Sequence, residues 1–361
     1  MNRSKISIEQ ICNLENCKLA IRNASKNKRK RKSVKKVLDN IDEYAAKLME
    51  FLTAKNLRFN EGAIATINEG TNRKQRNLCK PPFYPDQCAH WAIMQVVSPV
   101  LVKGFYKYSC ASIKGRGTHY AKHKLECSFK DIKNTKYCLQ LDIKSFYASI
   151  DKDVLVKLLS NKIKDKRVVN LLGKVIYSYS GSGLPLGYYT SSFLANFYLS
   201  PLDRLIKEEL HIKYYVRYMD DMVMYSSSKR KLHSAKRIIE KFIADNLKLK
   251  LKHTWQVYKM PYDNGKGKVT SQRATGFLGY KYYRYKTTIR KSIFKRMLRL
   301  FRRLHFGEYT VKAAHSFAAY NGYLKCTNSK KVLLKYVDGK FNKNILREMI
   351  RDETRTINSR K

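Results

Sequence analysis

The sequence contains few acidic residues and many basic ones. Its 361 residues include 28 Asp and Glu against 75 Lys and Arg, which gives a formal net charge of +47. A compact fold with this charge repels itself unless a polyanion neutralises it, and a nucleic acid is the polyanion that fits best. The charge balance therefore predicts a nucleic-acid partner. The 26 tyrosines add rings on which bases can stack.

Long apolar stretches and zinc-type cysteine spacings are also missing. The sequence has no apolar run of about 18 residues and no signal peptide, so we expect a cytoplasmic protein with no membrane partner. None of the eight cysteines forms a Cys-x-x-Cys pair, which favours reduced, mostly buried thiols. His119 and His123 lie four residues apart but lack companion ligands for a metal ion.

The most informative stretch is residues 214–225, Tyr-Tyr-Val-Arg-Tyr-Met-Asp-Asp-Met-Val-Met-Tyr. The aromatic and apolar flanks predict two strands, and Met-Asp-Asp predicts the tight turn of a hairpin. Asp220 and Asp221 repel each other at this tip, and a bound divalent cation would offset the repulsion. A plain surface turn is the alternative, because Asp is common in turns.

A third carboxylate lies upstream, in a segment that begins Cys138-Leu-Gln-Leu-Asp-Ile. Leu139, Leu141 and Ile143 alternate with polar residues, so Asp142 is predicted on the opposite face of a strand. A strand with Asp142 beside a hairpin with two Asp residues can converge three acids on two Mg²⁺ ions. Carboxylate oxygens suit Mg²⁺, whereas His and Cys would favour zinc.

Two basic segments stand on either side of these acids. Residues 70–85 are bounded by Gly and Pro and hold Arg73, Lys74, Arg76 and Lys80. Such a basic hairpin suits a triphosphate or a phosphate backbone, although a solvated loop is equally consistent with it. From Thr287 an apolar helical stripe lies beside a basic face, which favours nucleic acid over a membrane or a calmodulin-like partner.

Taken in order, these motifs resemble those of a reverse transcriptase. The motifs are the basic hairpin, Leu-Asp-Ile-Lys-x-Phe-Tyr, Leu-Pro-x-Gly, Tyr-Met-Asp-Asp, Phe-Leu-Gly and a basic helical tail, over about residues 34–330. The resemblance implies an α+β right-hand polymerase fold, with fingers and palm on an antiparallel sheet and a short helical thumb. It implies a basic N-terminal arm and helix over 1–60, fingers and palm over 61–286, and a basic thumb over 287–361.

The resemblance also implies roles for individual residues. The catalytic acids, which hold two Mg²⁺ ions with Mn²⁺ as an alternative metal, are Asp142, Asp220 and Asp221, and Ile143 belongs to the same metal site. The residues expected at the dNTP are Lys74, Arg76, Phe146, Tyr147, Leu186 and Gly187. Those expected at the nucleic acid are Tyr218, Met219, Arg290, Lys291, Lys295 and Arg299. Tyr147 would exclude the ribose 2′-hydroxyl, because only added bulk rejects one extra hydroxyl group.

Within the family, the aliphatic Leu186 before Gly187 resembles the bacterial diversity-generating retroelement enzymes. That group typically continues as Thr-Ser-Gln, whereas Ser192 follows Thr190 and Ser191 here. This departure favours the related reverse transcriptases of antiphage defence. The expected partners are an RNA template and primer, the cDNA product, a dedicated structured non-coding RNA and an accessory protein.

Two other functions are consistent with parts of the sequence. A non-catalytic RNA-binding scaffold on the same fold would not need the acids, the aromatic gate and the basic fingers together. An RNA-dependent RNA polymerase usually carries Gly-Asp-Asp and a small or polar gate residue, unlike Tyr147. RNA-directed DNA synthesis is therefore the leading hypothesis.

Overall fold

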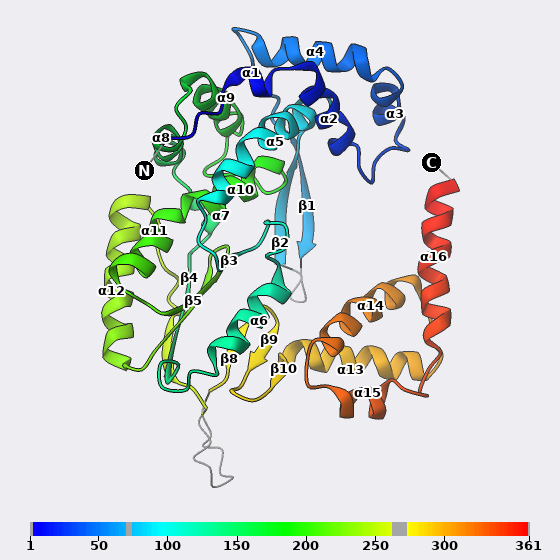
Figure 1. The fold of residues 1–361 in the computed structure, drawn as a ribbon. Coiled ribbons are helices and arrows are strands. Elements are labelled where there is room, and N and C mark those ends of the chain that lie inside the picture. The colour runs from blue at the N-terminus through cyan, green and yellow to red at the C-terminus, as the bar shows by residue number, and fades with distance from the viewer. Residues whose placement is uncertain (1–2, 70–73, 262–272, 360–361) are drawn as a thin grey trace. The chain divides into compact units, whose positions relative to one another are not determined.

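The computed structural model describes residues 3–69, 74–261 and 273–359, and it divides into two compact units (Figure 1). Unit 1 holds residues 1–121, 139–225 and 230–256, and unit 2 holds residues 122–138, 226–229 and 257–361. Helices and strands occur in both units, which confirms the predicted α+β class. The division into arm, fingers–palm and thumb stays a prediction.

Unit 1 combines a sheet with a large set of helices. Its strands are β1 (Ala63–Glu69), β2 (Lys74–Lys80), β3 (Ser109–Cys110), β4 (Tyr137–Asp142), β5 (Tyr214–Tyr218) and β6 (Asp221–Ser226). Its first helices are α1 (Ile8–Ile11), α2 (Leu14–Ala24), α3 (Lys32–Asp39), α4 (Ile41–Thr53), η1 (Phe83–Gln87) and α5 (Cys88–Lys103). The later ones are α7 (Phe146–Ser149), α8 (Lys152–Lys162), α9 (Lys166–Tyr177), α10 (Tyr189–Tyr198), α11 (Ser200–Arg204), η2 (Leu205–Glu209) and α12 (Lys229–Leu247).

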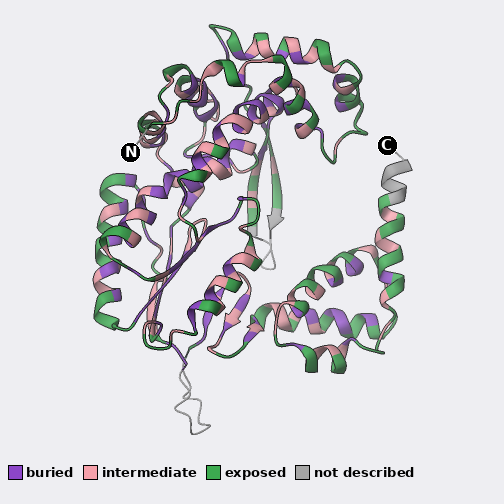
Figure 2. Ribbon diagram, in the orientation of Figure 1, coloured by how far each residue is buried: buried purple, intermediate pink, exposed green. Residues whose placement is uncertain are grey.

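The central strands of unit 1 follow the order β3-β5-β6-β4. β5 and β6 form an antiparallel hairpin, and both are mostly buried in Figure 2. β3 pairs with β5 in parallel, so the sheet is mixed. The long chain segment between β3 and β5 supplies the crossover that a parallel pair requires.

The N-terminal region is more ordered than its polar composition indicated. In α2, Cys17, Ala20 and Ile21 are fully buried, and the helix packs against α4 and α5. Asn16 on α2 donates its side-chain amide to the carbonyl of Ala92 on α5, at 3.0 Å. The helical spacing of these small and apolar residues was easy to overlook among their polar neighbours.

The basic hairpin predicted before the first proline is present as β1 and β2. The two strands pair antiparallel from Ala63 opposite Lys80 to Glu69 opposite Lys74. Residues 70–73, which include Arg73, lie outside the described part of the chain, as does the side chain of Lys74. The structure therefore places the backbone of this hairpin and the side chain of Arg76.

Unit 2 consists mainly of helices. Its elements are α6 (Thr118–Ser128), β7 (Gln256–Lys259), β8 (Thr275–Phe277), β9 (Tyr280–Tyr282), β10 (Thr287–Ile289), α13 (Lys291–His305), α14 (Val311–Lys325), α15 (Lys330–Tyr336) and α16 (Lys343–Ser359). The predicted helix starts later than Thr287, because Thr287–Ile289 pairs with β9 as a strand. Met297, Phe301 and Leu304 on α13 pack into a core with α14.

None of the helices within residues 3–69, 74–261 and 273–359 has both the length and the apolar character needed to cross a bilayer.

Candidate active site

The acidic hairpin turn has the predicted form. Tyr218 at the end of β5 pairs with Asp221 at the start of β6, so Met219 and Asp220 form a two-residue loop between them. Met219 has a φ of +52°, a left-handed conformation that costs a residue with a side chain about 1–2 kcal/mol. The strained loop places the Asp220 carboxylate at the tip of two buried strands.

Asp142 comes to the same place from the neighbouring strand. It is the last residue of β4, and β4 and β6 are hydrogen-bonded neighbours in the sheet. Its Oδ2 lies 2.5 Å from Nζ of Lys252, and its backbone carbonyl accepts a 2.8 Å hydrogen bond from the Lys252 amide. Its buried Oδ1 has no hydrogen-bond partner among the described residues. Oδ2 of Asp142 is thus paired with the Lys252 ammonium, whereas Oδ1 has no cation beside it among the described residues.

The electrostatics of Asp220 show how close the acids lie. Burial, and after it the negative charge of Asp142, raise the pKa of Asp220 to about 6. The cation of Lys252 acts against this shift. Two carboxylates that share a desolvated position lower their free energy by taking up a cation or a proton.

The donor chemistry of this position fits a hard divalent cation. Asp142 supplies an unpartnered buried oxygen, and Asp220 and Asp221 supply further carboxylates from the adjoining turn. No group of three His, Cys, Asp or Glu side chains within the described ranges is gathered closely enough to form a complete metal site. Ile143 is fully buried and forms a bridge with Leu251, so its backbone is fixed beside Asp142.

Tyr147 lies against the acidic turn. It belongs to α7, and its hydroxyl is 3.9 Å from Sδ of Met219. Burial is the main cause that raises the pKa of Tyr147 to about 12, and the nearby groups Asp220 and Tyr218 contribute to this shift. Arg76 on β2 acts in the opposite direction, so the guanidinium lies within electrostatic range of the ring. Phe146, its neighbour, is buried.

The glycine-rich loop 181–187 connects Tyr147 with the β1–β2 hairpin. Leu184 donates its amide to the carbonyl of Tyr147 at 2.8 Å, and Leu186 accepts from the amide of Cys79 at 2.7 Å. A Cβ on Gly183 would lie 2.1 Å from the Tyr147 carbonyl oxygen, and one on Gly187 would lie 2.2 Å from the Cys79 oxygen. Only glycine therefore fits at these two contacts.

Comparison with known proteins identifies the family. The family model described as reverse transcriptase (RNA-dependent DNA polymerase) matches residues 84–282, more than half of the chain. The chain belongs to the reverse transcriptase family. The match includes β4, the glycine-rich loop and the acidic hairpin, and the right-hand polymerase fold follows from membership of this family.

Several curated relatives share part of this family region. The chain is 29% identical over 170 residues to an uncharacterized 91 kDa protein in the cob intron of Schizosaccharomyces pombe, covering 45% of this chain and 20% of that protein. It is 27% identical over 149 residues to the group II intron-encoded protein LtrA of Lactococcus lactis, covering 39% and 24%. It is 31% identical over 107 residues to the retron Ec73 reverse transcriptase of Escherichia coli, covering 26% and 34%.

This reverse transcriptase therefore spans between a fifth and about a third of the length of these three relatives. Among solved structures, telomerase from Candida albicans with a fragment of telomeric RNA gives a TM-score of 0.49 at 11% identity, covering 82% of this chain and 59% of that one. Apo telomerase from Candida tropicalis gives 0.49 at 13% identity, covering 82% and 57%. Likeness of this size carries no argument about function.

The predicted nucleic-acid residues of this family member lie in two places. Tyr218 and Met219 are half-buried beside the acids in unit 1. In unit 2, Arg290 caps the N-terminus of α13, and an exposed row follows it along the helix. The members of this row, spaced four residues apart on one face, are Lys291, Lys295 and Arg299.

A buried arginine behind the turn is the main feature that sequence reasoning missed. Arg217 on β5 is fully buried and pairs with Asp203 through two of its three guanidinium nitrogens. Nε donates to Oδ1 of Asp203 at 2.8 Å, and Nη2 donates to Oδ2 at 2.6 Å. Its Nη1 donates to the backbone carbonyl of Met219 at 3.1 Å and to Oδ1 of Asn196 at 3.1 Å. The available signal was an arginine inside an otherwise apolar strand, which demands a buried partner.

Lys252 is the second residue that the sequence did not single out. It ends the alternating segment Leu247–Lys252, whose leucines are buried and whose lysines point to the other side. The alternation favoured a half-exposed strand, whereas the structure has only an isolated bridge at Leu251. Nothing in the alternation connected Lys252 with Asp142, more than a hundred residues away. That pairing arises only because Ile143 and Leu251 form a bridge.

Proposed function

We propose that the chain is an RNA-directed DNA polymerase that makes cDNA by two-metal nucleotidyl transfer. The observation that carries this proposal is the approach of Asp142 to the Tyr218-Met-Asp-Asp221 turn, where burial and mutual repulsion raise the pKa of Asp220 to about 6. Carboxylates held in this way bind cations favourably, because a cation offsets their mutual repulsion. The family match supports the same chemistry.

The three acids would hold two Mg²⁺ ions, or Mn²⁺, beside the backbone of Ile143. When bound, the metal ions lower the pKa of the attacking 3′-hydroxyl and neutralise charge on the leaving pyrophosphate. The chain's own contribution is to fix the carboxylates on strands β4, β5 and β6, which are hydrogen-bonded to one another. Lys252 orients the Asp142 carboxylate through one oxygen and leaves the other oxygen for a metal ion.

The incoming nucleotide would lie between Tyr147 and the β1–β2 hairpin. Arg76, with Lys74 on the same strand, would hold the triphosphate, since guanidinium groups bind phosphate oxygens in a bidentate manner. Tyr147, supported by Phe146, would exclude the ribose 2′-hydroxyl. Leu186 and Gly187 would let the backbone approach the new base pair. At Gly187 a Cβ would also collide with the carbonyl oxygen of Cys79.

The nucleic acid would be bound on both units. Tyr218 and Met219 would contact the primer end beside the acids. The exposed cations of α13 would bind phosphates along the duplex as a thumb, and these are Arg290, Lys291, Lys295 and Arg299. The arm and helix over 1–60 and the fingers and palm over 61–286 complete the proposed division.

For the biological role, we propose an antiphage defence system in which the template is a dedicated structured non-coding RNA, with an accessory protein as a further partner. The support is the departure at Ser192 from the pattern of diversity-generating retroelements, which are the alternative. Sequencing the nucleic acid that co-purifies with the protein separates the two roles. A single structured RNA and its cDNA support defence, whereas cDNA with miscopied adenines supports diversity generation.

The proposed activity is tested with the double variant Asp220→Asn, Asp221→Asn. On a primed RNA template with Mg²⁺ and dNTPs, the wild-type protein should extend the primer and the double variant should not. A matched control, Glu240→Gln with Asp245→Asn, removes two exposed acids from α12 and should retain activity. If the double variant extends the primer at the wild-type rate, the assignment of the acids is wrong.

A further inference from the structure

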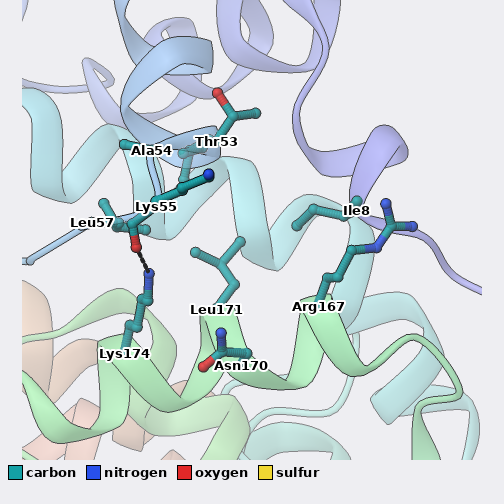
Figure 3. Close-up of a pocket in the computed structure, with 10 residues that line it drawn as sticks. Ile8, Thr53, Ala54, Lys55, Leu57, Arg167, Asn170, Leu171 and Lys174 are labelled. Atoms are coloured by element: carbon teal, nitrogen blue, oxygen red, sulfur yellow. Dashed lines mark hydrogen bonds between the residues drawn. The ribbon is translucent and has the colours of Figure 1, made fainter.

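Two adjoining hollows lie on α8 and α9, on elements other than those that carry the acids. The first has a volume of about 350 Å³ and lies between the end of α4 and the side of α9 (Figure 3). The second has a volume of about 590 Å³ and lies between α8, α9 and residues near the N-terminus. Asn170 and Lys174 on α9 line both hollows, so the two hollows meet at these side chains and belong to one surface.

The rim of this surface is strongly basic. The charged side chains that line the two hollows are Arg3, Lys55, Lys164, Lys166, Arg167 and Lys174, and no Asp or Glu is among the described lining residues. Arg167 is already neutralised, since it pairs with Glu9 at 2.6 Å and with Asp165 at 2.8 Å. The other five cations have no carboxylate partner in the surface itself, which makes it complementary to a polyanion.

The floor of each hollow is apolar. Leu52, Leu57 and Leu171 line the first hollow, and Val156, Ile163 and Val169 line the second. Figure 3 shows Leu171 on α9 between Lys174 and Arg167, with Lys174 hydrogen-bonded to the carbonyl of Lys55. A pocket of this volume with an apolar floor and few polar groups is typical of small-molecule or single-base recognition.

An aromatic ring completes the second hollow. Tyr177 at the end of α9 is 50% exposed, and its hydroxyl donates a hydrogen bond to Asp153 on α8. Nζ of Lys152 lies over the same ring, 6.0 Å from its centroid, and the exposed half of the side chain is where a base could stack. Exposed aromatic rings next to a basic groove are the usual means of binding single-stranded nucleic acid without strict sequence preference.

We propose that this surface binds a single-stranded segment of RNA, with bases in the two hollows and phosphates on the basic rim. Asn170 and Lys174 lie between the two apolar floors. Two separate bases would fit this arrangement better than a protein helix, which would present one continuous apolar face. The inference goes beyond the proposed polymerase function, because it assigns a second RNA contact on elements that hold none of the proposed catalytic residues. It would serve to hold a long template or scaffold RNA.

Parts of the site are already held in place. The amide of Ser4 donates to the carbonyl of Lys162 at 2.8 Å, and the amide of Lys164 donates to the carbonyl of Ser4 at 3.0 Å, so the segment that carries Arg3 is fixed beside the end of α8. The amide of Ile8 donates to Asp165 at 3.1 Å. A site that is formed before the ligand arrives loses less entropy on binding.

The test is binding of a fluorescein-labelled 12-nucleotide single-stranded RNA to the full chain, followed by fluorescence anisotropy at several salt concentrations. The slope of log Kobs against log salt measures the number of phosphate contacts, at about 0.7 per contact for single strands. In the triple variant Lys164→Gln, Lys166→Gln, Lys174→Gln, this slope should be less steep by about 2. The matched control is Arg230→Gln, Arg237→Gln, Lys241→Gln, which removes three exposed cations from α12. The control should leave the slope within 0.5 of wild type.

The ring is tested by Tyr177→Ala, which should weaken binding about tenfold, whereas Tyr177→Phe should bind as wild type does. Thermal unfolding of each variant shows whether the protein is still folded. If both triple variants change the slope equally, or if Tyr177→Ala binds as tightly as Tyr177→Phe, the inference is wrong. If an acidic peptide displaces the RNA from wild type and the lysine variant equally, the inference is also wrong.

Primer extension on a short, preformed RNA–DNA hybrid separates this inference from the proposed function. The variants on α9 should extend such a hybrid at the wild-type rate, because they touch none of the proposed catalytic residues. Loss of RNA binding in a protein that proves inactive as a polymerase would still support the surface. An active polymerase with unchanged RNA binding in all variants would overturn the surface and leave the proposed function intact.

Discussion

At the scale of single residues, the turn is held from behind by a buried ion pair. Arg217 and Asp203 are both almost fully buried, and Tyr215 donates a further hydrogen bond to Asp203 at 2.7 Å. A buried pair of this kind adds little net stability, but removal of one partner leaves an uncompensated charge. Through the carbonyl of Met219, the pair fixes the loop that carries Asp220. We therefore regard Arg217 as a positioning residue.

The substitution Arg217→Met should destabilise the protein by about 3–5 kcal/mol, because it strands the Asp203 carboxylate in the core. The free energy of unfolding in urea measures this effect. Adding Asp203→Asn should recover part of the loss, since the buried charge is then gone. Arg237→Gln on the exposed side of α12 is the control and should change stability by less than about 0.5 kcal/mol. If Arg217→Met is as mild as this control, the pair does not hold the turn.

We propose that Tyr147 decides which sugar is accepted. Replacing it with Ala removes the ring that lies against Met219, and incorporation of rNTPs relative to dNTPs should rise by about 100-fold, the scale on which one hydroxyl is discriminated by bulk. Tyr147→Phe keeps the ring and should retain discrimination. Primer extension with matched rNTP and dNTP concentrations measures the ratio. Equal ratios for the Ala variant and wild type would exclude a gate at this position.

The sequence predicted the candidate acids at this scale but not their support. Asp142 was identifiable because it stands in an alternating apolar pattern, and Asp220 and Asp221 because they form an acidic turn between two apolar runs. Arg217 and Lys252 were not, because their partners Asp203 and Asp142 come from other segments and only the folded sheet brings them together. Long-range ion pairs leave no local pattern in a single sequence.

At the scale of elements, the glycine-rich loop 181–187 is the connection between the proposed gate and the proposed fingers hairpin. It contacts the backbone of Tyr147 through Leu184 and the backbone of Cys79 through Leu186. Two of its glycines, Gly183 and Gly187, have positive φ angles of 69° and 112°. The sequence predicted a flexible turn here, yet the structure shows a tightly packed one.

Gly183→Ala should therefore be damaging. The added Cβ would lie 2.1 Å from the carbonyl oxygen of Tyr147, in a left-handed backbone conformation, so we expect a loss of more than about 2 kcal/mol and slower primer extension. The matched control is Gly322→Ala in α14, where a Cβ meets nothing within 4 Å and helix propensity predicts a gain of about 1 kcal/mol. Chemical denaturation of both variants checks the signs. A gain in stability for Gly183→Ala would contradict the packing.

Several element boundaries were mispredicted for simple physical reasons. Within the N-terminal arm and helix expected over 1–60, the chain forms several helices, and Asn40 separates α3 from α4. The helix expected from Thr287 begins at Lys291, since Ile289 pairs with Tyr280 in a strand. In both cases, apolar residues at helical spacing were present, but tertiary contacts decided where each helix starts.

At the scale of the whole molecule, a buried histidine links stability to pH. His90 on α5 is packed between the rings of Phe59 and Tyr188, and neither of its ring nitrogens has a hydrogen-bond partner in the described part of the chain. Burial lowers the pKa of His90 to about 3. The unfolded chain binds a proton near pH 6.5 while the folded chain stays neutral, so stability falls as the pH drops from about 6.5 towards 3.

His90 should lower the free energy of unfolding by about 2 kcal/mol between pH 7 and pH 5. The reason is that pH 5 lies about 1.5 units below the pKa of an unfolded histidine, and each unit corresponds to about 1.36 kcal/mol. His90→Phe should remove that part of the pH dependence, because the phenyl ring cannot be protonated and suits the same aromatic surroundings. Urea unfolding at the two pH values measures it, with the exposed His253→Phe as control. Unchanged pH dependence in His90→Phe would show that His90 is protonated in the folded protein.

The net charge of +47 was the feature of the whole molecule most easily interpreted from composition, and the family match agrees with it. Composition pointed to a nucleic-acid partner, and the spacing of motifs pointed to polymerase chemistry. What composition left open was where the charge gathers. The structure places part of it on α13, which the basic helical tail had indicated, and part around the hollows of α9, which no motif marked.

The central claim is that Asp142 and the acidic turn form one catalytic centre, and single-nucleotide incorporation tests it most directly. Wild type and Asp142→Asn are each given a primed RNA template, one complementary dNTP and Mg²⁺, with the exposed Asp245→Asn as control. Wild type and the control should each add one nucleotide rapidly. For Asp142→Asn, the rate of incorporation should fall on the order of a thousandfold, while binding of the RNA–DNA hybrid is retained. Incorporation by Asp142→Asn at the wild-type rate would contradict it.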